Sequence, residues 1–243
     1  MTTNPTPTAV LVHGAFADAA SWSGVIAELQ SDGIPVVAPP NPLRGLAADA
    51  AYIASVAAQI DGPIVLVGHS YGGAIITVAG TADNVVGLVY VAAYVPEEGE
   101  SLADLQGRFP EPALAASLRT ATYPAEGPAG TEPLVEFTIE QEAFPTVFAA
   151  DVPEEVTKVL AVAQRPLAAG AFTEPAAAAA WKTKPSWALV AVADHAINPV
   201  VQRFGAKRAG ATVIEIDGAS HAVAVSRPKA VANLIRDAVS ATS

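Results

Sequence analysis

Residues 63–73 read Pro-Ile-Val-Leu-Val-Gly-His-Ser-Tyr-Gly-Gly, an apolar run followed at once by a Gly-x-Ser-x-Gly motif centred on Ser70. The apolar run predicts a buried strand, and residues 74–80 after the motif are compatible with a helix. A serine between a strand and a helix lies on a sharp turn that imposes a strained backbone conformation. The flanking glycines permit this turn because they have no Cβ. The stretch therefore predicts a nucleophile elbow, with Ser70 as the nucleophile.

Continuous apolar runs recur along the chain and alternate with helical patterns. The runs predict strands at 9–12, 35–38, 64–67, 85–93, 187–192 and 212–216, and the helical patterns lie at 21–31, 47–60, 74–80, 199–209 and 227–241. Strands that are apolar throughout are typical of parallel sheets covered on both faces. We expect one α/β domain with a doubly wound, mostly parallel sheet of about six strands.

The alternation stops between residues 97 and 184, where prolines and glycines recur among short helical patterns. We expect residues 1–96 and 185–243 to form the core and residues 97–184 to form an inserted, mainly helical cap. Residues 153–163 predict one helix of this cap, and the alanine run 176–180 fits another.

Five of the seven phenylalanines and Trp181 fall in the expected cap. Small-molecule pockets are mostly apolar and aromatic, so these rings are candidates for a substrate pocket. The alternative, that they form a small core of the cap itself, stays open. The pocket residues that we predict are Phe16, Phe109, Phe144, Phe148 and Trp181.

Composition restricts the class of protein. Of the 243 residues 51% are hydrophobic and 15% are charged, which supports a folded core. The net charge of −11, with no cluster of Lys and Arg, argues against nucleic acid as a partner. The longest apolar run, residues 85–95, is shorter than the ~20 residues of a membrane-spanning helix. We expect no membrane association, and residues 1–8 lack a basic or apolar leader, which favours a cytoplasmic location.

A serine hydroxyl is a weak nucleophile at neutral pH, and it needs a histidine base that a carboxylate orients. The chain has four histidines. His69 lies inside the elbow, His13 precedes the glycine of the first predicted turn, and His195 adjoins the best candidate acid. We therefore predict His221, in the small-residue loop after the last predicted strand, as the base for Ser70.

Two carboxylates are candidates for the residue that orients His221. Asp194 follows the predicted strand 187–192, at the sheet edge where parallel α/β proteins hold their catalytic groups. Asp217 lies four residues before the histidine and has an alternative role as a turn former before Gly218. We favour Asp194 and keep Asp217 as its rival.

Attack of a serine on a carbonyl carbon produces an oxyanion, and each donor aimed at it contributes roughly 3 kcal/mol in serine hydrolases. The backbone N–H of Tyr71, directly after the nucleophile, is the first predicted donor. The second comes from the turn after the first strand, where we predict Ala15, with Phe16 as the alternative.

Together these motifs resemble those of the α/β-hydrolase superfamily, in particular its compact group of plant methyl-ester hydrolases, hydroxynitrile lyases and small bacterial esterases. The resemblance covers almost the whole chain and rests on His-Gly-Ala at 13–15 with Ser-Trp at 21–22, the elbow, Asp-His-Ala-Ile-Asn-Pro at 194–199 and Gly-Ala-Ser-His at 218–221. It implies the α/β-hydrolase fold, in which serine, acid and histidine follow in this order. Residues 97–184 resemble the group only loosely.

The main hypothesis for the function is a serine carboxylic ester hydrolase that acts on small to medium hydrophobic esters and needs no metal or other cofactor. The alternatives are a hydroxynitrile lyase, a cofactor-free perhydrolase and a non-catalytic small-molecule receptor. Lyases similar to this chain carry a threonine at the position of Gly14 and a lysine at the position of Ala222. Both differences favour the esterase.

Overall fold

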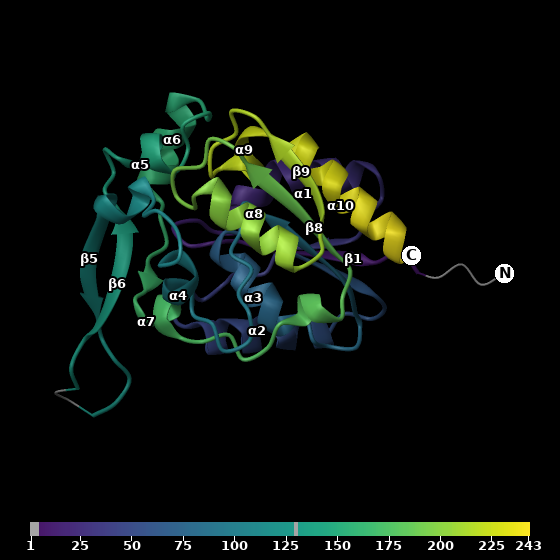
Figure 1. The fold of residues 1–243 in the computed structure, drawn as a ribbon, viewed down its shortest axis with the longest axis horizontal. Helices are drawn as coiled ribbons and strands as arrows, with labels where there is room; N and C mark the ends of the chain where they lie inside the picture. Colours follow the sequence, from purple (N-terminus) through teal and green to yellow (C-terminus); the bar gives the residue numbers. More distant parts are fainter. Residues whose placement is uncertain (1–4, 129–130) are drawn as a thin grey trace.

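The computed structural model describes residues 5–128 and 131–243. Its centre is a six-stranded, wholly parallel sheet with the strand order β2-β1-β3-β4-β8-β9 (Figure 1). The strands are β1 (Thr8–Val12), β2 (Val36–Val37), β3 (Ile64–His69), β4 (Val85–Val91), β8 (Ser186–Ala191) and β9 (Thr212–Ile216). From β1 the chain passes to β2 at one edge of the sheet. It then returns to β3, on the other side of β1, and continues through β4 and β8 to β9 at the opposite edge, which confirms the predicted doubly wound fold.

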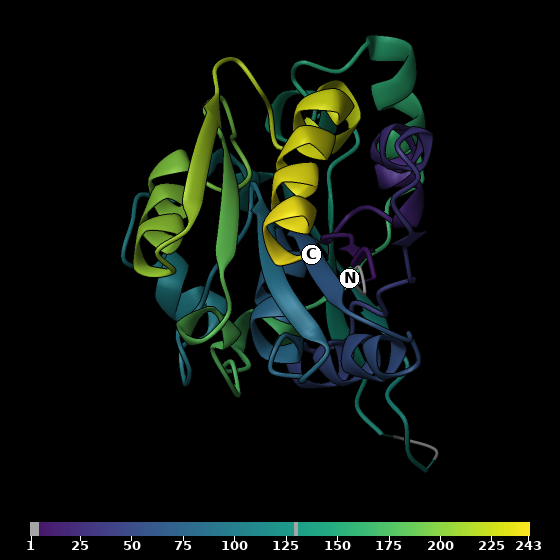
Figure 2. The same cartoon turned by 90° about the vertical axis from the view of Figure 1, so that its right-hand side faces the viewer.

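Helices cover both faces of the sheet, as Figures 1 and 2 show. On one face lie α1 (Ser23–Ser31), α9 (Val223–Ser226) and α10 (Pro228–Thr242), and on the other lie α2 (Leu46–Ala58), α3 (Tyr71–Ala79) and α8 (Pro199–Arg208). Successive residues of a strand point to opposite faces. In β3, Leu66 packs under α2 and α3, and Val67 packs under α1 and α10. Because helices cover both faces of the sheet, the residues on both faces are apolar. The strands therefore show no alternation of apolar and polar residues in the sequence.

The segment between β4 and β8 contains short helices and a small second sheet. It comprises α4 (Leu102–Gln106), η2 (Ala113–Ser117), β5 (Leu118–Tyr123), β6 (Leu134–Ile139), α5 (Phe144–Val147), α6 (Glu154–Val162), β7 (Leu167–Ala168), α7 (Gly170–Thr173) and η3 (Ala180–Lys182). We call residues 97–184 the cap segment. In Figure 1 its elements from β5 to α7 lie at the end of the sheet opposite the two termini, and the chain after α7 returns beneath the sheet.

Two features of the cap segment differ from the sequence prediction. β5, β6 and β7 form a three-stranded antiparallel sheet that the sequence analysis did not anticipate. The strands of its hairpin are largely exposed, so they lack the apolar pattern by which buried strands are found. The alanine run 176–180 is not an α-helix, and only Ala180 belongs to the short turn η3. Alanine favours a helix, but the contacts of this segment with the core override that weak preference.

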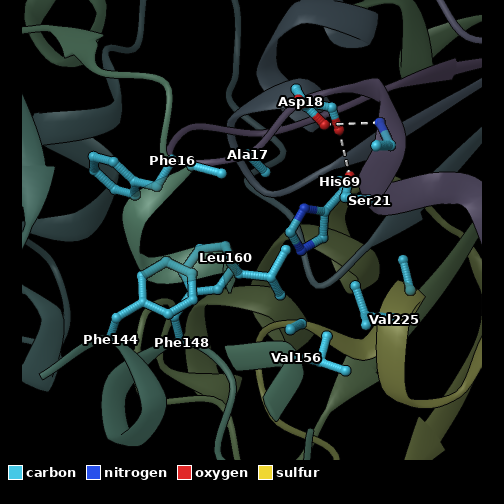
Figure 3. Close-up of a pocket in the computed structure, with 14 residues that line it drawn as sticks. Phe16, Ala17, Asp18, Ser21, His69, Phe144, Phe148, Val156, Leu160 and Val225 are labelled. Atoms are coloured by element: carbon cyan, nitrogen blue, oxygen red, sulfur yellow. Dashed lines mark hydrogen bonds between the residues drawn. The ribbon is translucent and has the colours of Figure 1, made fainter. Parts of the chain in front are cut away.

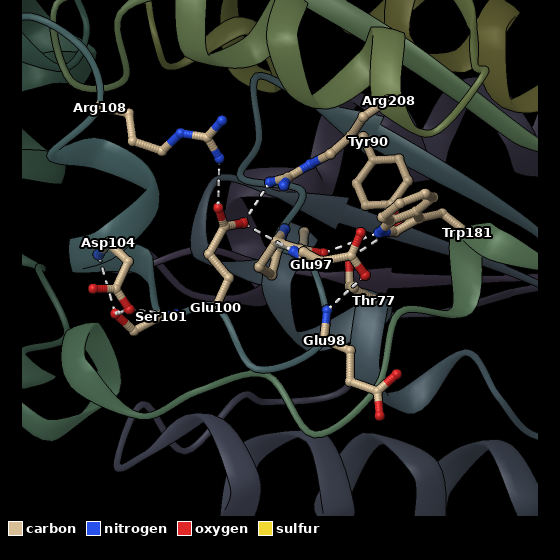
Figure 4. Close-up of polar contacts among 12 residues, drawn as sticks. Thr77, Tyr90, Glu97, Glu98, Glu100, Ser101, Asp104, Arg108, Trp181 and Arg208 are labelled. Carbon is tan, nitrogen blue, oxygen red and sulfur yellow. Dashed lines mark hydrogen bonds and ion pairs between the residues drawn. The ribbon is translucent and has the colours of Figure 1, made fainter.

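A cluster of ion pairs joins the start of the cap segment to α8 (Figure 4). Glu100 accepts hydrogen bonds from Arg208 of α8 at 2.6 Å and from Arg108 at 3.0 Å. Both guanidinium groups also lie over the ring of Phe204: that of Arg108 is 4.6 Å from the ring centroid, and that of Arg208 is 4.9 Å from it. The side chains of Arg208 and Glu100 are 15% and 12% exposed, so water screens this pair less than it screens a surface pair. The cluster fixes the beginning of the cap against the core.

Across the two described ranges, every helix is too short or too polar to cross a membrane. Residues 85–95 are the longest apolar run of the chain. This run supplies strand β4, which lies at the centre of the sheet.

Candidate active site

Ser70 makes the connection between β3 and α3 by itself, because β3 ends at His69 and α3 begins at Tyr71. Its backbone has φ 56° and ψ −122°, a conformation that costs of order 1–3 kcal/mol for a residue with a side chain. A Cβ on Gly68 would lie 2.4 Å from the carbonyl oxygen of Gly72, and a Cβ on Gly72 would lie 2.4 Å from that of Val12, which explains the glycines on both sides of the turn. The structure thus has the strand, turn and helix that a nucleophile elbow requires.

The backbone around Ser70 is fixed by its neighbours. Its N–H donates to the carbonyl of Val91 at 3.2 Å, and its own carbonyl accepts from Gly73 at 3.0 Å and from Tyr94 at 3.2 Å. The turn after β1 packs directly on it, since a Cβ on Gly14 would lie 2.6 Å from the Ser70 Cβ. β1 and β3 are the neighbouring strands from which the chain departs in opposite directions, and ligands of such sheets bind at this switch point.

His221 and Asp194 form a buried pair in the loops that follow β9 and β8. The Nδ1 atom of the imidazole and Oδ2 of the carboxylate are 2.7 Å apart, and the two side chains are 1% and 0% exposed. A carboxylate oxygen accepts, so Nδ1 carries the proton and Nε2 keeps a free lone pair. His221 lines the same cavity as Ser70, and the described residues include no hydrogen bond between the two side chains. Such bonds are often long until a substrate is bound.

Three further donors hold Asp194 in place. The backbone N–H groups of Ala196 and Ile197 donate to Oδ1 at 2.7 Å and 2.9 Å, and the side chain of Gln202 donates to Oδ2 at 2.7 Å. The side-chain amide oxygen Oε1 of Gln202 in turn accepts from the backbone N–H of Ala191 at 3.0 Å, which ties this glutamine to β8. Gln202 was not among the predicted site residues, because the sequence of a helix does not show which residue outside it a single glutamine side chain contacts.

In the described part of the chain, the side chains of His13, His195 and the rival carboxylate Asp217 do not hydrogen-bond to the pair of His221 and Asp194. The ring of His13 bonds to backbone through both nitrogens: Nε2 accepts from Asn41, and Nδ1 donates to the carbonyl of Gly14, each at 2.9 Å. This arrangement fixes the turn after β1. His195 and Asp217 are exposed side chains on the surface.

His69 supports the loop that carries His221. Its Nε2–H donates to the carbonyl oxygen of His221 at 2.9 Å, and the two ring centroids are 4.7 Å apart. Burial is the main cause that lowers the pKa of His69, to about 3, so the ring is neutral near pH 7. It offers His221 a packed, uncharged neighbour.

The candidate oxyanion donors differ in availability. The N–H of Phe16 donates to the carbonyl of Arg165 at 3.1 Å, so this alternative donor already has an acceptor. Ala15 and Tyr71 line the cavity together with Ser70. For neither backbone N–H does the described part of the chain provide an acceptor. The N–H of Tyr71 belongs to the first turn of α3, where helix amides lack partners inside the helix.

The cavity beside Ser70, which we call the Ser70 cavity, has a volume of about 20 Å³. This is room for about one water molecule. Of the predicted pocket residues, Phe16 and Phe148 line it, and so does Phe172, a cap phenylalanine that we did not select.

Three other predicted pocket residues do not line the Ser70 cavity. Phe144 stacks on Phe148 with centroids 4.8 Å apart and lines a neighbouring cavity instead. Phe109 packs on Phe204, 5.3 Å between centroids, and Trp181 donates from Nε1 to the carbonyl of Pro96 at 2.9 Å. The prediction was wrong for Phe109 and Trp181, because these rings attach the cap segment to the core.

The cap segment also holds the loop that carries His221. The hydroxyl of Ser220 donates to Oδ1 of Asp151 at 2.5 Å, and the N–H of Ala222 donates to the carbonyl of Phe148 at 2.9 Å. Arg227 lies 3.3 Å from Oδ2 of Asp151. Both chain neighbours of His221 are therefore bound to residues 148–151, a connection with no signal in the sequence.

A buried carboxyl group lies behind the elbow. Oδ2 of Asp49 accepts from the hydroxyl of Tyr71 at 2.9 Å, and Oδ1 accepts from the N–H of Arg44 at 3.1 Å. Burial raises the pKa of Asp49 and also that of Tyr71. The hydrogen bond to Asp49 fixes the side chain of Tyr71, a residue that lines the Ser70 cavity. Within residues 5–128 and 131–243, no three His, Asp or Glu side chains gather as metal ligands would.

A sequence model of the alpha/beta hydrolase family matches residues 9–234, and the chain belongs to this family. A curated relative is the carbendazim hydrolyzing esterase of Nocardioides sp. (strain SG-4G), with 34% identity over 123 residues. That match covers 44% of this chain and spans half the length of the relative.

Solved structures share the fold over nearly the whole chain. Polyneuridine aldehyde esterase superposes with a TM-score of 0.82 at 20% identity, covering 96% of this chain and 99% of the other. A pyrethroid hydrolase from Sphingobium faniae JZ-2 gives 0.75 at 23% identity, covering 97% and 98%. A methylesterase from Arabidopsis gives 0.77 at 18% identity, covering 96% and 99%. At these identities the likeness concerns the fold.

Proposed function

We propose that the protein is a serine carboxylic ester hydrolase that acts on small to medium hydrophobic esters. The observation that carries the proposal is the meeting of Ser70, on its strained turn, with the buried pair of His221 and Asp194 at one cavity. Serine, base and acid in this arrangement perform acyl transfer on several unrelated folds.

In the first half of the reaction, Ser70 Oγ attacks the ester carbonyl carbon and gives its proton to His221 Nε2. The charge that develops on the imidazole is stabilised by Asp194, 2.7 Å from Nδ1. The backbone N–H groups of Ala15 and Tyr71 donate to the oxyanion. His221 then returns the proton to the alcohol oxygen, the C–O bond breaks, and the acyl group stays on Ser70.

In the second half, a water molecule attacks the acyl-enzyme. His221 Nε2 takes one proton from this water, the tetrahedral oxyanion forms again at Ala15 and Tyr71, and the proton returns to Ser70 Oγ as the acid leaves. Each step uses groups of the chain and water, so the chemistry as proposed consumes no cofactor.

The preference for apolar esters is supported by the walls of the Ser70 cavity, where Leu102, Leu114 and Leu167 accompany the phenylalanines. The names of the relatives, esterases and hydrolases of organic esters, agree with this class. The lyase alternative is less favoured, because Gly14 packs on Ser70 with no space for a larger side chain. Cytoplasmic location stays a prediction from the sequence.

The test is hydrolysis of p-nitrophenyl esters from acetate to octanoate by the parent protein and by Ser70→Ala. We expect turnover in the parent and a loss of at least a thousandfold in the variant, whose fold circular dichroism would check. Residual activity within tenfold of the parent would exclude Ser70 as the nucleophile. A folded parent without turnover would favour the lyase or receptor, and cyanohydrin cleavage would separate those two.

A further inference from the structure

Figure 3 shows a second cavity, which we call the side cavity. It has a volume of about 180 Å³, against about 20 Å³ beside Ser70. Phe16 and Phe148 line both cavities and therefore form the wall between them. An ester at Ser70 has more atoms than the Ser70 cavity holds, and the larger free space is behind this wall.

The lining of the side cavity is mostly apolar and comes from four parts of the chain, one of which is His69 at the end of β3. The cap segment contributes Phe144, Val156 and Leu160, and the chain after His221 contributes Ala222 and, from α9, Val225. The segment after the first turn contributes residues 16–18 and 20–21. The cavity thus lies between the cap segment and the core, adjacent to the catalytic loop.

The polar groups in this lining carry no free positive charge. His69 is held neutral by burial, which lowers its pKa to about 3. The carboxylate of Asp18 accepts from the N–H of Ala20 at 2.8 Å, and the hydroxyl of Ser21 donates to the Asp18 carbonyl at 2.7 Å. An occupant without charge fits these walls best.

The volume indicates the size of the occupant. An engineered apolar cavity of about 150 Å³ in another protein binds benzene. The side cavity, at about 180 Å³, is of similar size, and its walls are mostly apolar. It matches one aromatic ring or an alkyl group of comparable bulk.

The position of the side cavity relative to His221 indicates which half of the ester enters it. The alcohol oxygen of the substrate receives its proton from His221, so its substituent extends on the His221 side. Ala222 and Val225, which follow His221, form the wall there, and the ring of Phe148 lies 4.8 Å from that of His221. The carbonyl oxygen points instead toward the amides of Ala15 and Tyr71.

We propose that the side cavity binds the alcohol group of the ester and selects uncharged alcohols with a single aromatic ring, such as benzyl alcohol. This proposal rests on the function proposed above. The acyl C–O bond breaks, the benzyl oxygen takes the proton from His221 and leaves as benzyl alcohol, and the small acyl group remains on Ser70 until water removes it. Entry of the ring requires Phe148 or Phe16 to turn aside.

The test compares two isomeric esters, benzyl acetate and methyl phenylacetate, which carry the aromatic ring on opposite sides of the ester bond. Leu160→Trp places an indole in the side cavity, and Ala163→Phe narrows it from the rim. The matched control is Val159→Trp on the same helix, because Val159 is 62% exposed and does not line the cavity. The readout is the ratio of kcat/KM for benzyl acetate to that for methyl phenylacetate.

We expect this ratio to fall at least tenfold in Leu160→Trp and in Ala163→Phe and to stay unchanged in Val159→Trp. A ratio within twofold of the parent in both folded variants would overturn the proposal. A rise would overturn it too, since the cavity would then hold the acyl group.

Binding of 4-fluorobenzyl alcohol, followed by fluorine NMR on Ser70→Ala protein, separates this proposal from the proposed function. Saturable binding that Leu160→Trp abolishes supports the side cavity even when the parent hydrolyses no ester. Ester turnover by the parent without such binding would contradict the side cavity and leave the esterase function standing.

Discussion

Among single residues, Asp194 is the partner on which His221 depends in the proposed mechanism. The carboxylate fixes the proton on Nδ1 and stabilises the imidazolium, and it accepts at 2.7 Å in a buried position. Asp194→Asn can donate to Nδ1 and so favours the wrong tautomer. We expect kcat to fall by roughly 1,000- to 10,000-fold, as such a change does in a serine protease, with little change in KM.

The matched control for this prediction is Asp217→Asn, the exposed rival four residues before His221. Steady-state kinetics on one p-nitrophenyl ester measures both variants. Equal losses in the two variants, or a loss confined to Asp217→Asn, would contradict the assignment.

The sequence predicts residues of the site well where a motif surrounds them. Ser70 and Tyr71 belong to a strand-turn-helix pattern, and Asp194 and His221 each follow a recognisable strand. Gln202 could not be predicted, because its importance comes from a bond across a loop to Asp194 that depends on the folded chain.

At the scale of elements, the connection between the cap segment and the His221 loop is open to test. Asp151→Ala removes the acceptor of the Ser220 hydroxyl and the partner of Arg227. The loop then loses part of its support, and small displacements of a catalytic group are costly. We expect kcat to fall by roughly 10- to 100-fold with a smaller change in KM.

Asp151→Asn is the conservative variant, since its amide oxygen can still accept from Ser220, and it should restore most of the activity. Glu154→Ala is the surface control: Glu154 pairs with Lys158 on α6 with both side chains largely exposed, and such pairs contribute little. Loss of thermal stability in Asp151→Ala with no change in kcat would show that the contact is merely structural.

The elements of the core are predictable and those of the cap less so. Buried parallel strands such as β3 and β4 carry a continuous apolar signal. The exposed hairpin of β5 and β6 has no such signal, and its strands form through pairing with each other. Aromatic enrichment alone does not separate rings that line a cavity from rings, such as Phe109 and Trp181, that attach the cap segment to the core.

At the scale of the whole molecule, buried neutral histidines make stability depend on pH. Burial lowers the pKa of His69 to about 3 and also lowers that of His13. The unfolded chain binds protons at these rings below about pH 6.5, while the folded chain does not. Stability is therefore fully present above that pH and is lost as the pH falls toward 3.

His69→Gln removes one of these groups and can keep the bond to the carbonyl of His221. We expect the unfolding free energy of the parent to fall between pH 7.5 and pH 5, and this fall to be smaller in His69→Gln by roughly 1 to 2 kcal/mol. Urea unfolding at the two pH values measures it. The exposed His195→Gln serves as control, and identical pH dependence in the parent and His69→Gln would contradict the prediction.

Covalent labelling with a fluorophosphonate, followed by intact mass and peptide mapping, shows whether Ser70 is an activated nucleophile. We predict one adduct per chain, located on Ser70, absent in Ser70→Ala and formed at least a hundredfold more slowly in His221→Ala. An adduct on another residue, or no adduct on folded parent protein, would contradict the account of Ser70 as an activated nucleophile.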